Sequence, residues 1–412
     1  MTAADVLIWV PRSLLYPVHL VFEYGLRWPL VKLTSLAEKH HLIERTKRLF
    51  IYRDGKTIIL PTAFVDFGLR PNVGFYFSWD ELFASNNKLV LQAGFWGQQW
   101  VDVAATDRIS VFRNNEGTVS IGGEFLTRPD RPYYGIGSTS RKTDEAFYRI
   151  RRVDANVSLH GNLGGMNWAE MEVGYRNVYF SQGQARSVGE VFKEASMPGF
   201  GSGYDLIHAD LSLRLDTRKR ERAFTSGSGV GLEAKGSFDV DPGDTKRNFF
   251  TWSLQGDAFW DFSGVNHVIS ASVYVGFVEA TGSKAVPFSE LPMLGGDRLR
   301  GFLEGRFLGE STFVATVDYR YPVSALFDAN IFIELGNVFG KHLKEISFEN
   351  MHLSWGVGLR AGLTRDASFD VLMAFGSDRL GCLGAGPRDA SCGSDSSAVE
   401  NIRFLFGVNQ GF

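Results

Sequence analysis

One arginine and two carboxylates carry the most informative charges in this chain. Arg300 lies in a long, glycine-containing segment, and Asp318 and Glu334 follow in two segments where apolar and polar residues alternate. Alternation with a period of two puts both carboxylates on the polar faces of neighbouring strands. An enclosed pair of carboxylates is costly unless a cation meets it, and one guanidinium can donate to both. We therefore expect Arg300 to bind Asp318 and Glu334; the alternative is a solvated loop arginine above two acids that line a hydrated pore.

Residue spacings typical of enzyme active sites are not evident. No serine lies in a Gly-x-Ser-x-Gly motif. The glycines from Gly295 to Gly301 are not followed by the Lys-Ser/Thr pair of a phosphate-binding loop. His40, His41 and Glu44 suggest a metal cluster at first sight, but adjacent histidines point to different faces of a helix. We predict that the protein is not an enzyme and that it binds neither a cofactor nor a metal ion.

The two cysteines, Cys382 and Cys392, lie ten residues apart in a segment rich in Gly, Ser and Asp. This spacing favours a small loop closed by a disulfide in an oxidising compartment. A pair of free thiols is the alternative.

Alternating strands can position these residues. Near the C-terminus Ile402, Phe404 and Phe406 alternate with Arg403 and Gly407, which is the pattern of a strand with one apolar face. The same pattern recurs upstream. We predict strands near residues 57–69, 73–81, 88–101, 104–114, 118–127, 146–160, 165–180, 204–217, 224–239, 248–262, 266–280, 312–321, 325–338, 353–361, 369–376 and 400–412.

The lengths of the strands and connections favour a membrane barrel over a soluble sandwich. Many predicted strands have about ten or more residues, which suits a tilted bilayer crossing. Short and long connections alternate, as in outer-membrane barrels. The long ones are predicted at residues 128–141, 182–203, 281–309, 340–350 and 380–398, and short turns at 263–265, 322–324 and 364–366. The fold class is therefore all-β: a closed, transmembrane antiparallel barrel of about 16 strands, spanning residues 57–412.

The segment before the barrel, residues 1–56, is predicted to be periplasmic and partly helical. Apolar and charged residues between Leu30 and Phe50 have the spacing of an amphipathic helix. Such a helix could pack at the barrel mouth, plug the pore or mediate self-association. The apolar stretch from Val6 to Leu33 is interrupted by charges and prolines, which disfavours a spanning helix. No signal peptide is evident at residues 1–10, so in an exported protein we expect it to have been removed.

Composition supports this interpretation and excludes one class of partner. Aromatic residues make up 14% of the chain and there are 46 glycines, as expected of aromatic girdles and crowded barrel walls. The net charge is -3 and there is no long basic run, so we predict no nucleic-acid binding.

Three motifs in order resemble the BamA/TamA-type outer-membrane assembly and translocation superfamily, also known as bacterial surface antigen barrels. The first is Leu299-Arg300-Gly301-Phe302, which matches the aliphatic-Arg-Gly-aromatic tetrad of the family's signature loop. The others are Asp318-Tyr319-Arg320, an acid-x-Arg element, and the segment from Phe332 through Glu334 to Gly336, a Phe-x-acid-x-Gly element. Weaker matches occur at residues 133–137 and 215–218. The resemblance covers roughly residues 57–412.

The resemblance implies a structural role for these residues. Arg300, Asp318 and Glu334 would hold the loop inside the barrel, while Gly301, Phe302 and Gly336 would shape its seat. In the family this loop supports a weak seam between the first and last strands, where client strands can pair. The terminal Phe412 resembles the signal by which such barrels are themselves assembled.

The resemblance implies a bacterial outer-membrane protein that assists the assembly or transport of outer-membrane proteins or lipids. Its partners would be outer-membrane lipids and unfolded outer-membrane protein clients or a periplasmic protein. Family members usually carry periplasmic POTRA modules, and residues 1–56 are too short for one, so the chain resembles a POTRA-less member. The alternatives are a scaffold barrel that forms a homodimer or binds a periplasmic partner, and a simple pore.

Overall fold

A computed structural model describes residues 49–409, with gaps at 67–70, 98, 112–116, 184–185, 220–225, 241–245, 263, 265–266, 324–326, 365–366, 384–391 and 393–396. Most of the chain's first 56 residues and Phe412 therefore lie outside the described residues. The amphipathic helix predicted near residues 30–50 and the terminal assembly signal stay predictions.

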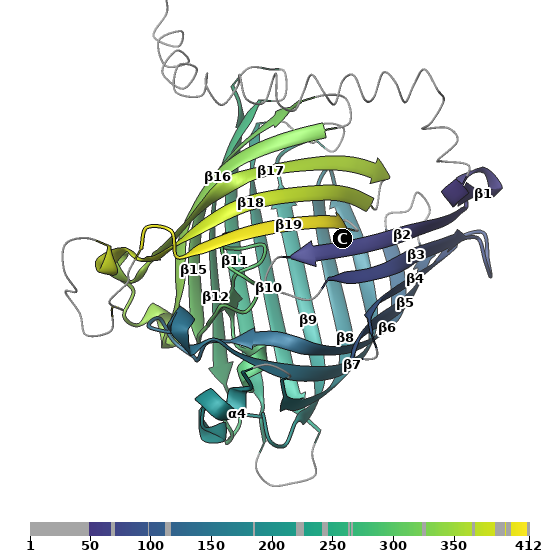
Figure 1. Cartoon of the computed structure of the whole chain (residues 1–412). Helices are drawn as coiled ribbons and strands as arrows, with labels where there is room; N and C mark the ends of the chain where they lie inside the picture. The colour runs from purple at the N-terminus through teal and green to yellow at the C-terminus, as the bar shows by residue number, and fades with distance from the viewer. Residues whose placement is uncertain are drawn as a thin grey trace, which may run out of the picture.

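The structure is a closed antiparallel barrel (Figure 1). Its sheet contains the short strand β1 (Ile51–Tyr52) and sixteen barrel strands, as the alternation predicted. The barrel strands are β2 (Thr57–Asp66), β3 (Asn72–Asp80), β4 (Asn87–Trp96), β5 (Trp100–Ser110), β6 (Gly117–Tyr133), β7 (Ala146–Gly164), β8 (Asn167–Gln182), β9 (Tyr204–Asp216), β10 (Gly227–Asp239), β11 (Phe249–Asp261), β12 (Val268–Ala280), β15 (Ser311–Pro322), β16 (Phe327–Phe339), β17 (His352–Thr364), β18 (Ala367–Arg379) and β19 (Asn401–Asn409). Each strand pairs with its neighbours in sequence, and β19 pairs with β2 to close the barrel.

The helical elements that lie wholly within the described residues are short. They are α4 (Val188–Val191) and the 3-10 turns η2 (Arg53–Gly55), η3 (Lys142–Asp144), η4 (Glu194–Ser196), η5 (Phe288–Glu290), η6 (Lys341–Leu343), η7 (Phe348–Asn350) and η8 (Leu380–Cys382). None of the helices in the described residues is both long and apolar enough to cross a membrane.

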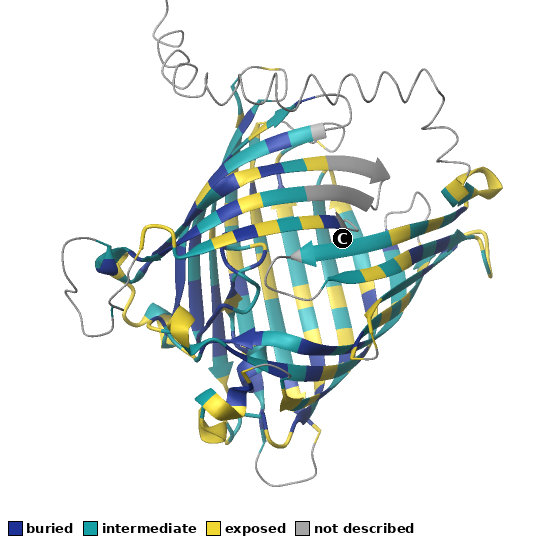
Figure 2. Cartoon of the chain, in the orientation of Figure 1, coloured by how far each residue is buried: buried dark blue, intermediate teal, exposed yellow. Residues whose placement is uncertain are grey.

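Apolar side chains cover the outside of the barrel and polar ones face the lumen. Val157, Val173 and Ile333 are 51%, 58% and 47% exposed, whereas Asp318 and Glu334 on the opposite face are 7% and 2% exposed. Figure 2 shows the resulting alternation of buried and exposed residues along the strands. An apolar outer wall and a polar interior are what a bilayer requires of a barrel.

The connections gather at two ends. The predicted long loops all join strands at one end, which we call the long-loop end, and it also carries α4 (Figure 1). Some boundaries differ from the prediction. β4 ends at Trp96 rather than near 101, and β5 begins at Trp100 rather than near 104. β6 continues to Tyr133 instead of ending near 127, after a register shift between Arg128 and Arg131. The extension is favoured because Tyr133 packs edge-on against Phe192 and Phe288 in a buried cluster that joins strand ends to loops. The bulge hides it in the sequence, since one irregularity reverses the alternation.

Candidate functional site

The loop between β12 and β15 folds back into the lumen. Two short strands, β13 (Met293–Leu294) and β14 (Phe307–Leu308), pair with each other and carry a tip that we define as residues 295–306. Gly295 and Gly296 have φ values of 107° and 75°, which glycine adopts without the penalty that a side chain would add. Leu299 also has a positive φ, of 66°, and its fully buried side chain packs in a cluster with Phe302 and Phe307.

Arg300 reaches both predicted carboxylates. Its Nε donates to Glu334 Oε1 at 2.9 Å, and its Nη1 donates to Asp318 Oδ2 at 3.0 Å. The backbone N–H of Arg300 donates to the other oxygen of Glu334, at 2.5 Å. Asp318 lies on β15 and Glu334 on β16, and these strands are adjacent. The guanidinium therefore spans two neighbouring strands, as the alternation implied.

Additional groups contact these charges. Ser354 Oγ donates to Glu334 Oε2 at 3.0 Å, and Asn330 Nδ2 donates to Asp318 Oδ2 at 3.0 Å. The guanidinium of Arg300 lies 3.5 Å from the ring centroid of Phe332, in the geometry of a cation–π contact. Buried charges persist when they are paired and hydrogen-bonded in this way. We call Arg300, Asp318 and Glu334 the loop ion cluster.

Gly301 and Phe302 seat the tip against β17 and β18. The N–H of Gly301 donates to Ser354 Oγ at 2.8 Å. A Cβ on Gly301 would lie 2.2 Å from the carbonyl oxygen of Phe375, so only glycine fits this approach. Phe302 is fully buried, and its ring lies over Gly376, where a Cβ would come 2.5 Å from the ring.

Arg320 and Gly336, the remaining predicted residues, lie outside the loop ion cluster. Arg320 lines a lumen cavity of ≈ 330 Å³ beside Arg300 and Asn330. Gly336 lies on β16 opposite Val314, and a Cβ there would come 2.5 Å from the carbonyl oxygen of Phe313. Gly336 thus allows close packing within the wall, next to the buried side chains of the tip.

Three charged contacts to the tip were missed in the sequence. From the last strand, Arg403 Nη1 donates to the carbonyl oxygens of Gly296 and Arg300, at 2.8 and 3.2 Å. The alternation of β19 does place Arg403 on the lumen face, but the sequence does not show what it faces.

The other two contacts lie at the end of the tip. Arg131 Nη1 lies 2.6 Å from Glu304 Oε2, and its guanidinium lowers the pKa of that carboxyl. Arg306 is 2% exposed and donates from Nη1 to Ser140 Oγ at 2.9 Å. Both contacts join the tip to the β6–β7 side of the barrel.

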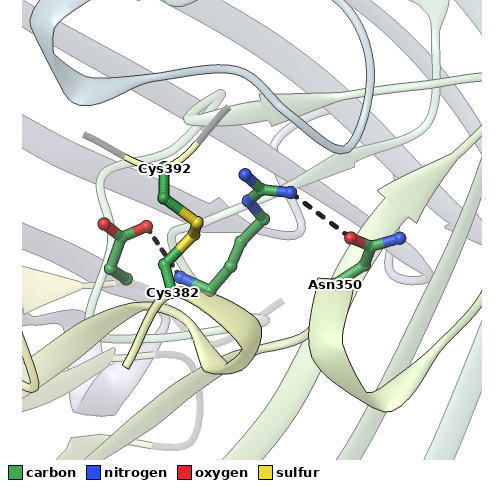
Figure 3. Close-up of a disulfide and its surroundings, with 5 residues drawn as sticks. Asn350, Cys382 and Cys392 are labelled. Atoms are coloured by element: carbon green, nitrogen blue, oxygen red, sulfur yellow. Dashed lines mark hydrogen bonds between the residues drawn. A yellow bond between two sulfur atoms is a disulfide. The ribbon is translucent and has the colours of Figure 1, made fainter. Parts of the chain in front are cut away.

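Cys382 and Cys392 form a disulfide in the loop between β18 and β19 (Figure 3). The bridge lies beside Asn350 in Figure 3, where Arg379 Nη1 donates to Asn350 Oδ1 at 3.3 Å. The disulfide is therefore part of the long-loop end.

The sequence model of the Omp85 superfamily domain matches residues 66–365. The chain belongs to the Omp85 superfamily. A search of curated protein sequences found no match.

Several solved structures of this superfamily have a similar fold. One is BamA from Haemophilus ducreyi lacking POTRA domains 1–3, with a TM-score of 0.58 and 15% identity over 86% of this chain and 70% of that chain. CdiB from Acinetobacter baumannii has a TM-score of 0.52 and 10% identity over 86% of this chain and 60% of that one. CdiB from Escherichia coli has a TM-score of 0.51 and 11% identity over 85% of this chain and 62% of that one. The chain thus spans less than two thirds of the two CdiB chains. The superfamily places this barrel in the outer membrane.

Proposed function

We propose that this Omp85 barrel assists the insertion of outer-membrane proteins, with client strands pairing at the junction of β2 and β19. We call this junction the seam. The observation that carries the proposal is its short ladder. Within the described residues β2 and β19 share three residue pairs, Phe64–Gly407, Val65–Phe406 and Asp66–Leu405. The two neighbouring junctions share eight and nine pairs, β2 with β3 and β18 with β19.

The ladder stops at Phe64–Gly407, and Thr57 and Ile58 pair with β1, so the backbone groups of β2 between Ile59 and Ala63 are available to a third strand. The register would bring Thr62 and Ala63 opposite Asn409 and Val408, yet these residues do not pair. Unpaired strand edges are templates for strand addition, which uses main-chain hydrogen bonds and accepts many sequences. Figure 1 shows β2 and β19 at the front of the barrel, overlapping along only part of their lengths.

The lumen loop contacts the barrel wall on one side of the seam. Its tip contacts the strands from β15 to β19 through Asp318, Glu334, Ser354, Gly376 and Arg403. This side of the barrel is therefore braced up to the seam. Arg403 holds β19 to the tip, whereas among the described residues no hydrogen bond joins the tip to β2, so opening would begin at β2.

The loop also bears on the alternative functions. A tip held across the lumen by ion pairs narrows the channel, which disfavours a simple pore. A scaffold barrel would keep the same fold and the same loop, and would differ by leaving the seam unused. In our proposal the role is not enzymatic, and the partners are outer-membrane lipids and unfolded clients, with or without a periplasmic protein that delivers them.

The test is a cross-link across the seam. Val65→Cys with Phe406→Cys places thiols on directly paired residues, whose Cα atoms in a ladder are about 4.5–5.5 Å apart, within disulfide range. The matched control is Val357→Cys with Met373→Cys, a pair on β17 and β18. Liposomes carrying each variant are given a urea-unfolded outer-membrane protein, and its folding rate is measured.

We expect the uncross-linked protein to accelerate folding over empty liposomes. The oxidised seam variant should lose that acceleration and regain it on reduction, while the oxidised control keeps it. Acceleration that survives a complete seam cross-link would contradict the proposed route. No acceleration by the folded, uncross-linked barrel would reject insertase activity and favour the scaffold.

A further inference from the structure

Three potential metal ligands meet at the long-loop end, apart from the loop ion cluster. His352 is the first residue of β17, Asp378 lies near the end of β18, and Glu400 directly precedes β19. One ligand atom from each lies within 4.8 Å of the other two. The strand ends bring these residues together although they are up to 48 positions apart in the sequence.

The hydrogen bond made by His352 leaves its second ring nitrogen available as a metal ligand. The side chain is 1% exposed, and its Nδ1 lies 2.9 Å from the carbonyl oxygen of Ser377. A carbonyl oxygen only accepts, so Nδ1 carries the proton, and in the neutral ring Nε2 is then the unprotonated nitrogen. Nε2 is buried and has no hydrogen-bond partner. A backbone carbonyl that fixes the tautomer and leaves the second nitrogen unprotonated is the usual arrangement around a metal-binding histidine.

Glu400 supplies a second buried atom without a partner. Its Oε1 lies 3.6 Å from Arg306 Nη2, whereas its Oε2 is buried and accepts no hydrogen bond. Asp378 Oδ1 accepts from the N–H of Arg379 at 2.7 Å, which orients that carboxylate. Unpaired buried acceptors are costly, and a cation bound between these residues would satisfy both.

We propose that His352, Asp378 and Glu400 bind a divalent transition-metal ion of the Zn²⁺ class. One imidazole nitrogen and two carboxylate oxygens suit Zn²⁺, with a water as fourth ligand, whereas Ca²⁺ and Mg²⁺ take oxygen ligands. Ligands at about 2.0–2.2 Å from a tetrahedral ion lie roughly 3.3–3.6 Å apart. Arg306 Nη2 lies 3.6 Å from Glu400 Oε1 and Arg306 also donates to Ser140, while Arg379 donates to Asn350.

The ion would connect the ends of three strands to the lumen loop. The ring of His352 lies 4.5 Å from that of Phe307 and 5.5 Å from that of Phe302, between centroids. Arg306 of the same loop holds the other oxygen of Glu400. Binding would therefore fix the start of β19 relative to the tip. The residues of β19 that pair with β2 lie further along the strand, at Leu405 to Gly407.

The experiment uses the full chain folded in detergent micelles and stripped with a chelator. Zn²⁺ binding is measured by equilibrium dialysis with metal analysis, and the gel mobility of unheated samples shows that each variant is folded. We expect Glu400→Gln and Asp378→Asn each to weaken Zn²⁺ binding at least tenfold. The matched control is Glu349→Gln, an exposed acid of η7, which should bind as the unchanged protein does.

A second group, Glu172, His208 and Asp210, also has ligand atoms within 4.8 Å of one another, so His208→Gln is included. Zn²⁺ binding that is lost in His208→Gln and kept in Glu400→Gln would overturn the assignment. So would the absence of Zn²⁺ binding to the unchanged chain, or preferential binding of Ca²⁺. If one of the two carboxylate variants fails to fold, the other decides the result.

Discussion

Glu334 depends on the lumen loop more than any other charge in the loop ion cluster. It is 2% exposed, and its two oxygens accept from Arg300 and Ser354. Without the Arg300 side chain, Asp318 keeps a hydrogen bond from Asn330, and Glu334 keeps those from Ser354 and from the backbone N–H of residue 300, but neither carboxylate keeps a cationic donor from the loop. The energetic role of Arg300 is therefore to neutralise a carboxylate that cannot reach water.

Arg300→Ala should destabilise the barrel by about 3–5 kcal/mol, because it leaves a buried charge uncompensated. The midpoint of thermal unfolding in detergent, followed by gel mobility, measures the effect. The double variant Arg300→Ala with Glu334→Gln should recover part of the loss, since the unpaired charge is gone. A double variant as unstable as the sum of the two single ones would contradict a direct ion pair.

Gly301→Ala should also destabilise the protein, by at least about 1–3 kcal/mol, as an overpacked site does. Its Cβ would collide with the carbonyl oxygen of Phe375, which belongs to the wall and cannot rotate away. Gly256→Ala is the matched control, because a Cβ there meets nothing within 4 Å. Equal unfolding midpoints for the two variants would show that the tip does not sit against β18.

At the scale of the element, each strand separates two environments by the direction of its side chains. On β7, Val157 is 51% exposed on the outer wall, while Ser158 next to it is 9% exposed on the lumen face. Neighbouring residues of one strand thus face different environments, one the lipid and the other the lumen. The same alternation explains why β6 could not be delimited from the sequence once its bulge had shifted the pattern.

Val157→Arg should destabilise the folded barrel in liposomes by about 2–4 kcal/mol, the cost of an arginine on the lipid face near mid-bilayer. Asn156→Arg, one position away and on the lumen face, should cost less because its charge stays among polar groups. Denaturant unfolding of both variants in the same lipid gives the comparison. The reverse order of stabilities would mean that this strand faces the other way.

At the scale of the whole molecule, the lumen loop occupies part of the lumen of the barrel. Its tip is bound to strands from β15 to β19 and, through Arg131 and Ser140, to the β6–β7 side. Contacts on both sides of the lumen make the loop a brace across the barrel.

We expect small or rare currents from the unchanged protein in planar bilayers, and more frequent openings with Arg300→Ala, because the tip then loses both ion pairs. Lys341→Ala, an exposed change in η6, should behave like the unchanged protein. Large steady currents from the unchanged protein would favour the simple pore.

The sequence alone determined the barrel and the composition of the loop ion cluster. Strands that border lipid must alternate with a period of two, so residues such as Ile402, Phe404 and Arg403 reveal their faces without any knowledge of neighbours. Two lumen carboxylates on consecutive strands require a cation, and the resemblance indicated Arg300.

Only the tertiary structure decided the remaining features. The contacts of Arg403 with the tip, the three-pair seam and the group of His352, Asp378 and Glu400 all depend on which strand ends meet after closure, and in what register. Alternation tells which face a side chain takes, but it does not tell what lies across the lumen. Which residues face each other across the lumen depends on the tilt and stagger of all the strands together. No local pattern of residues contains that information.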